Sequence, residues 1–69
     1  MNSTKISMNL PDEALHSLRE LADRHEITMT EAARRAISVL KYLDDERQAG
    51  HDLLIRDPQT KETDRLVFH

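Results

Sequence analysis

The chain has 69 residues, no cysteine and a formal net charge of −3. This length allows one small domain, and the lack of cysteine excludes disulfides and thiolate metal sites. A single core of this size is barely stable, so we expect oligomerisation to supply additional buried surface. No apolar run approaches the length of a membrane span and no signal-peptide pattern opens the chain, so we expect a cytoplasmic protein.

The negative charge is concentrated in the last third of the chain. Residues 1–43 carry six basic and six acidic side chains, whereas residues 44–69 carry four basic and seven acidic ones. A negative net charge is unusual for a nucleic-acid-binding protein, but here the excess lies away from the amino-terminal segment.

Residues 4–10 alternate strictly between polar and apolar side chains. Ile6, Met8 and Leu10 fall on one face, and Lys5, Ser7 and Asn9 fall on the other. Period-two alternation predicts a half-buried strand. The next forty or so residues have a helical pattern and supply no second strand. Unpaired backbone groups are costly, so we expect the same strand of a second copy to pair antiparallel about a two-fold axis.

Two helices are predicted after this strand. The first spans about residues 12–25, with Pro11 and two carboxylates at its amino end and a stripe of leucine and alanine along one side. The second spans about residues 29–49. It opens with the capping box Thr28-Met29-Thr30-Glu31, preceded by Ile27, and Gly50 is suited to its carboxyl-terminal cap. Small alanines early in this second helix indicate a close approach by another helix.

Residues 51–69 form a carboxyl-terminal extension to the predicted domain at residues 1–50. Leu53-Leu54-Ile55 and Leu66-Val67-Phe68 flank the turn-like sequence Asp57-Pro58-Gln59-Thr60-Lys61. This composition predicts either a small β-hairpin or a flexible tail. An isolated hairpin is marginal in water and needs a partner surface.

The order strand, helix, short turn, helix resembles the ribbon-helix-helix repressor family, to which the Arc and MetJ repressors belong. The residues that carry the resemblance are Lys5 to Pro11, Leu18 and Ala22, and Ile27 to Glu31 leading into Arg34-Arg35-Ala36-Ile37. The resemblance covers about residues 4–45. One departure is Glu26, which stands where family members often have glycine before the second helix.

The resemblance implies an intertwined homodimer whose two-stranded ribbon enters the DNA major groove. The base-contacting residues would be Lys5, Ser7 and Asn9. The second helix would contact a backbone phosphate through Thr28, Met29 and Thr30. The side chains expected in the dimer core share an apolar or small character and are Ile6, Met8, Leu10, Ala33, Ala36, Ile37 and Leu40.

The chemistry of these residues supports the same interpretation. The major groove admits a two-stranded ribbon; asparagine can bond to adenine, lysine to guanine and serine to either. Exposed N–H groups at a helix start favour a phosphate. Simpler interpretations are an ordinary solvated strand face for Lys5, Ser7 and Asn9, and plain N-capping for Thr28. For Arg34 and Arg35 we expect ion pairs with acidic neighbours rather than contacts with DNA.

Neither a metal site nor an enzyme is expected. His16 and Glu20 lie one helical turn apart, but no further histidine or cysteine completes a tetrahedral set. The chain has no cysteine nucleophile and no glycine-rich phosphate loop, and we expect no cofactor.

The sequence therefore predicts a homodimeric, bacterial-type transcriptional repressor that binds operator DNA, with adjacent dimers cooperating on repeated half-sites. An alternative is an antitoxin whose residues 51–69 bind a toxin while the amino-terminal dimer regulates its own operon. A third hypothesis is a DNA-independent dimerisation module that recruits a protein partner.

Overall fold

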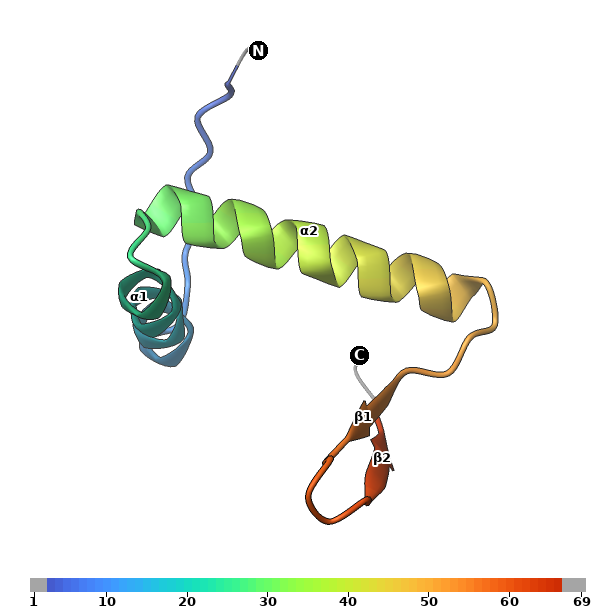
Figure 1. Ribbon diagram of the computed structural model, residues 1–69. Coiled ribbons are helices and arrows are strands. Elements are labelled where there is room, and N and C mark those ends of the chain that lie inside the picture. The colour runs from blue at the N-terminus through green and yellow to red at the C-terminus, as the bar shows by residue number, and fades with distance from the viewer. Residues whose placement is uncertain (1–2, 67–69) are drawn as a thin grey trace. The chain divides into compact units, whose positions relative to one another are not determined.

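The computed structural model describes residues 3–66 and is mostly helical (Figure 1). Helix α1 spans Asp12–His25 and helix α2 spans Met29–Gln48. They are followed by strands β1, Leu54–Arg56, and β2, Thr63–Arg65. The chain divides into two units: the first ends at Arg34, and the second, which begins at Arg35, holds the rest of α2 and both strands.

Both helices lie where the sequence predicts them. Pro11 precedes α1 with an extended backbone (φ −56°, ψ 150°) and accepts the first intrahelical bond, from the Leu15 N–H at 3.0 Å. Proline therefore occupies the N-cap rather than the first turn expected from its usual preference. Asp12 and Glu13 then place two carboxylates at the positive end of the helix dipole.

Helix α1 ends in a Schellman motif. The Ile27 N–H donates to the Ala22 carbonyl at 2.9 Å, and the Glu26 N–H donates to the Asp23 carbonyl at 3.2 Å. Glu26 takes the left-handed conformation that this motif requires, with φ 54° and ψ 46°. A residue with a Cβ atom takes this conformation at a steric cost that glycine does not have.

Two alanines on either side of this turn are the buried apolar side chains of residues 3–66. Ala22 is 3% exposed and Ala32 is 4% exposed. Leu15, Leu18 and Ile27 are half-buried. Ala22 and Ala32 place small side chains at these buried positions, and the close approach of another helix stays a prediction.

Helix α2 also ends in a Schellman motif, this time with glycine at the left-handed position. Gly50 has φ 85°, its N–H donates to the Arg47 carbonyl at 2.9 Å, and the His51 N–H donates to the Glu46 carbonyl at 3.0 Å. The His51 ring adds a contact of 2.5 Å between its Nδ1 and Glu46 Oε2. Gly50 is thus the helix stop that the sequence predicts.

The predicted hairpin forms, but its strands are displaced from the predicted apolar runs. Strands β1 and β2 pair antiparallel, with Leu54 opposite Arg65, Ile55 opposite Asp64 and Arg56 opposite Thr63. The second predicted run begins at Leu66, whose N–H donates to the Leu53 carbonyl at 2.7 Å. Val67 and Phe68 lie outside the described residues.

The turn of the hairpin is organised by one carboxylate. The Asp57 N–H donates to the Glu62 carbonyl at 2.8 Å and closes the loop, while Asp57 Oδ1 accepts from the Gln59 N–H at 2.9 Å. Lys61 takes the left-handed conformation (φ 67°), and its N–H donates to the Asp57 carbonyl at 2.8 Å. These bonds set the register, because they fix which residues face each other next to the turn.

Residues 3–10 form no strand within the single chain. The sheet of the described residues holds only β1 and β2. A strand needs a hydrogen-bonded neighbour, and the sequence assigns that neighbour to a second copy. The predicted intermolecular ribbon therefore stays a prediction.

Candidate nucleic-acid interface

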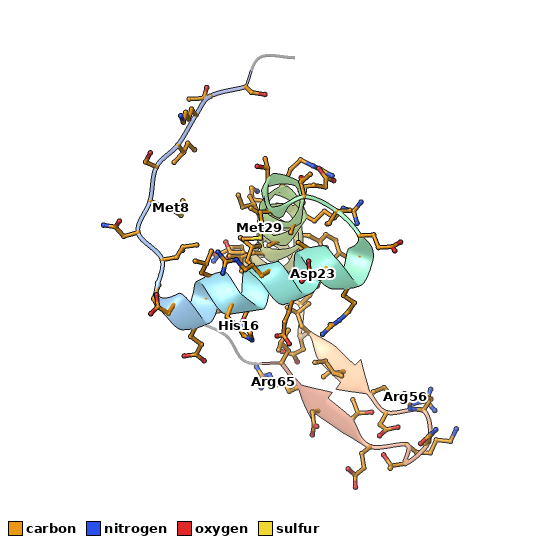
Figure 2. All side chains as sticks on the ribbon, turned by 90° about the vertical axis from the view of Figure 1, so that its left-hand side faces the viewer. Met8, His16, Asp23, Met29, Arg56 and Arg65 are labelled. Atoms are coloured by element: carbon orange, nitrogen blue, oxygen red, sulfur yellow. The ribbon has the colours of Figure 1, made fainter. Side chains whose placement is uncertain are left out.

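The segment before α1 is extended and exposes both of its predicted faces. Lys5, Ser7 and Asn9 are exposed, as expected for residues that meet solvent or a polar partner. Ile6, Met8 and Leu10 are exposed as well, and Met8, labelled in Figure 2, keeps 68% of its surface accessible. These three regularly spaced apolar side chains are thus accessible to a partner molecule.

Helix α2 exposes a second set of apolar side chains. Ile37 is 68% exposed, and Val39, Leu40 and Tyr42 are also largely accessible. Among the predicted core alanines, Ala33 is half-buried and Ala36 is exposed. The predicted dimer-core residues are therefore accessible in the single chain, except for the partial burial of Ala33.

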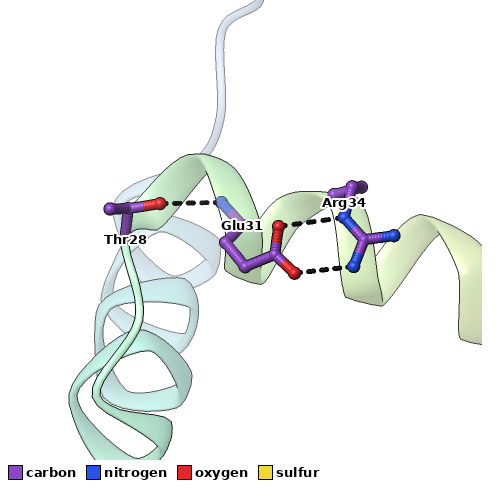
Figure 3. A network of polar contacts seen from close by, with 3 residues as sticks. All are labelled: Thr28, Glu31 and Arg34. Carbon is purple, nitrogen blue, oxygen red and sulfur yellow. Dashed lines mark hydrogen bonds and ion pairs between the residues drawn. The ribbon is translucent and has the colours of Figure 1, made fainter. Parts of the chain in front are cut away.

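The start of α2 has the geometry of a capped helix. Thr28 is the N-cap: its Oγ1 accepts from the Glu31 N–H at 3.0 Å, and its carbonyl accepts from the Ala32 N–H at 2.9 Å (Figure 3). This confirms one of the two bonds of the predicted capping box. The N–H groups of Met29 and Thr30 lie in the first turn, where a helix offers no internal acceptor. They are the donors that a phosphate oxygen could accept from.

The Glu31 carboxylate is held by an arginine one turn further along the helix. Arg34 donates to both of its oxygens, from Nε to Oε2 at 2.9 Å and from Nη2 to Oε1 at 2.6 Å (Figure 3). This hydrogen bonding, followed by the charge of Glu31, raises the pKa of Arg34 above its ordinary value. The ion pair predicted for Arg34 is confirmed, and it offsets the negative charge of Glu31 near the helix start.

Glu26 is a second carboxylate near the helix start. It lies two residues before the Thr28 cap and is exposed. Its charge opposes an incoming phosphate, whereas the helix dipole and the free N–H donors favour one. The predicted phosphate site therefore combines a suitable geometry with an unfavourable neighbouring charge.

Sequence reasoning did not assign a role to the arginines of the hairpin. Arg56 lies in β1 and Arg65 in β2, both labelled in Figure 2. Arg65 forms an ion pair with Asp52 through Nη2 and Oδ1 at 3.1 Å. The sequence signal for their placement is the turn around Asp57. This turn sets the strand register, and the register puts both arginines on the same face of the hairpin.

Residues 3–66 lack two further features, a cluster of metal ligands and a membrane-spanning helix. They contain no group of three histidine or acidic side chains positioned to hold a metal ion. In the same part of the chain, no helix combines the length and apolar character required to cross a lipid bilayer.

The chain matches no protein-family model, no curated protein and no solved structure.

Proposed function

We propose that the protein is a homodimeric ribbon-helix-helix repressor that reads operator DNA with an amino-terminal β-ribbon. The observation that carries the proposal is the exposed alternation of residues 4–10, where Ile6, Met8 and Leu10 interleave with Lys5, Ser7 and Asn9 in a segment without a backbone partner. Antiparallel pairing with a second copy satisfies the backbone groups and gathers six apolar side chains on one side.

The exposed apolar side chains of α2 provide the remaining dimer surface in this proposal. Ile37 and Leu40 lie three residues apart on the helix, so both can enter the same interface. Burying them with Met8 and its neighbours supplies the apolar surface that a chain of this length lacks on its own. The fold and the dimer would then form together.

Base readout follows from the other side of the ribbon. Two copies present two sets of Lys5, Ser7 and Asn9, whose donors and acceptors match base edges in the major groove. The two-fold axis of the dimer implies a palindromic or repeated operator. The first turn of α2 would contact a flanking phosphate through the N–H groups of Met29 and Thr30, with Thr28 as the cap.

Selection of bound sequences from a random duplex library, followed by footprinting, tests this function. We expect short symmetric or tandem motifs. Lys5→Ala and Asn9→Ala should abolish selective binding while the helical circular dichroism signal is unchanged. Arg19→Ala is a matched control because Arg19 is an exposed cation of α1 and is not one of the proposed base-reading residues.

A DNA-independent protein would behave differently. It would enrich no motif, and its dimer would form equally well with Lys5→Ala or Asn9→Ala. Either full retention of operator binding in both variants or the absence of any enriched sequence contradicts the proposal.

A further inference from the structure

The two faces of the carboxyl-terminal hairpin carry opposite charge. Side chains alternate across a strand, so the observed register assigns each residue to a face. The first face, which we call the basic face, holds Asp52, Leu54, Arg56, Thr63 and Arg65. The second, the acidic face, holds Leu53, Ile55, Asp57, Glu62, Asp64 and Leu66.

The charges within each face do not cancel. On the basic face, two arginines outweigh one aspartate, and the Arg65–Asp52 ion pair leaves Arg56 as the uncompensated cation. On the acidic face, three carboxylates have no cation among them. Asp57 directs Oδ1 to the turn, Asp64 lies in β2, and Glu62 directly precedes β2 and accepts a backbone hydrogen bond from Asp57. The acidic face is thus complementary to the basic one.

Both faces also carry apolar side chains that remain exposed. Leu54 on the basic face and Ile55 on the acidic face are each more than half accessible. A two-stranded hairpin with exposed strands on both sides is marginal in water and gains stability by covering a face. The occupant of one face must therefore offer apolar surface together with the opposite charge.

We propose that the basic face of one hairpin docks on the acidic face of the hairpin of a second copy. The second copy carries both required features, the opposite charge and an exposed apolar side chain, on the other face of its hairpin. Such a contact is heterologous, so it joins successive copies instead of closing a symmetric pair. The hairpin is thereby a self-association surface separate from the amino-terminal ribbon.

The small size of the hairpin face limits the strength of the contact. A face of five or six residues is far smaller than a standard interface of roughly 20–30 residues a side, so free copies should associate weakly. On adjacent DNA sites the effective concentration is high, and a weak contact then produces cooperativity. This second step rests on the proposed function; the contact itself does not.

Disulfide trapping tests the contact without DNA, because the chain has no native cysteine. Thr63→Cys places one thiol on the basic face and Ile55→Cys places one on the acidic face of another copy. The two full-length variants are mixed in equal amounts and oxidised at low salt. We expect the yield of the mixed cross-link, between position 63 of one copy and position 55 of the other, to exceed the yield of either like-with-like cross-link several-fold. A mixed product at no more than the random ratio, twice the yield of each like-with-like product for equal amounts of the two variants, would overturn the proposal, as would background yields of all three products.

A charge swap separates loss of contact from loss of the hairpin. Adding Arg56→Glu to the Thr63→Cys copy should abolish the mixed cross-link, because both docking faces are then acidic. Adding both Glu62→Lys and Asp64→Lys to the Ile55→Cys copy makes its docking face net positive and should restore the mixed cross-link. An unfolded hairpin could not be rescued in this way, so failure of the swap contradicts the proposal.

Duplexes with one and two operator sites complete the test. Arg56→Glu should leave affinity for a single site unchanged and reduce cooperativity between two sites, from about ten- to a hundredfold to near none. A loss of single-site affinity would show that Arg56 acts in DNA binding itself and would overturn the assignment of cooperativity to the hairpin contact. If the wild-type chain binds no duplex while the mixed cross-link forms, the proposed DNA-binding function fails and the hairpin contact stands.

Discussion

Glu26 and Gly50 occupy the same position at the ends of their helices, the left-handed residue of a Schellman motif, with φ 54° and 85°. Glycine reaches this conformation without steric cost, whereas a residue with a Cβ atom does not. The two helix ends therefore have the same hydrogen-bond geometry but different backbone strain.

Replacing Glu26 with glycine should stabilise the protein. We expect Glu26→Gly to raise the free energy of unfolding by about 1 kcal/mol, because it removes the left-handed strain. Urea denaturation measures the change. Glu26→Gln is the matched control, since it removes the charge and keeps the Cβ atom. Equal stabilisation by both variants would assign the effect to charge and contradict the strain argument.

The Thr28 hydroxyl should contribute measurably to folding. Thr28→Ala removes the acceptor of the Glu31 N–H, and loss of such a cap costs about 1 kcal/mol. Thr28→Ser retains the hydroxyl and should retain most of the stability. Thermal unfolding compares the three proteins, and a Thr28→Ala variant as stable as the wild type would exclude the cap as a stabilising feature.

Met8→Asp should abolish the dimer and most of the helical content. In the proposed ribbon, this change buries an unpaired charge between two strands. Sedimentation and circular dichroism report the two losses together. Ser7→Asp changes the adjacent residue on the opposite face, so it should weaken DNA binding and preserve the dimer. A folded, monomeric Met8→Asp protein would refute the assigned interface.

The salt dependence of operator binding should be shallow. The logarithmic slope is about −0.9 per neutralised phosphate, and this chain offers few cations near the proposed groove-reading face. A wild-type slope steeper than about −8 is incompatible with the small number of phosphate contacts.

Glu26→Gln should tighten operator binding at low salt, because it removes a carboxylate near the proposed phosphate site.

Local signals made the helices predictable. Pro11, Thr28 and Gly50 each act on neighbouring backbone groups, so the sequence alone locates both helices to within one residue. The strands of the hairpin were harder to predict, because apolar runs do not fix strand register. The hydrogen bonds around Asp57 fix the register, and β1 begins one residue later than the predicted run that starts at Leu53.

The candidate site was predictable only in part. Thr28 and Arg34 contact Glu31 within one helical turn, and both contacts follow from sequence spacing. The proposed pairing of residues 4–10 would depend on another chain, so a single chain cannot test it. The charge difference between the hairpin faces likewise emerges only when the register is known.

The central claim is that residues 4–10 of two copies pair as antiparallel strands. An isotope-filtered NMR experiment on mixed labelled and unlabelled protein tests it most directly. If the strands pair, we expect nuclear Overhauser contacts between backbone protons of the two copies along residues 4–10. A monomer in which the segment contacts only its own helices, or has no contacts, would contradict it.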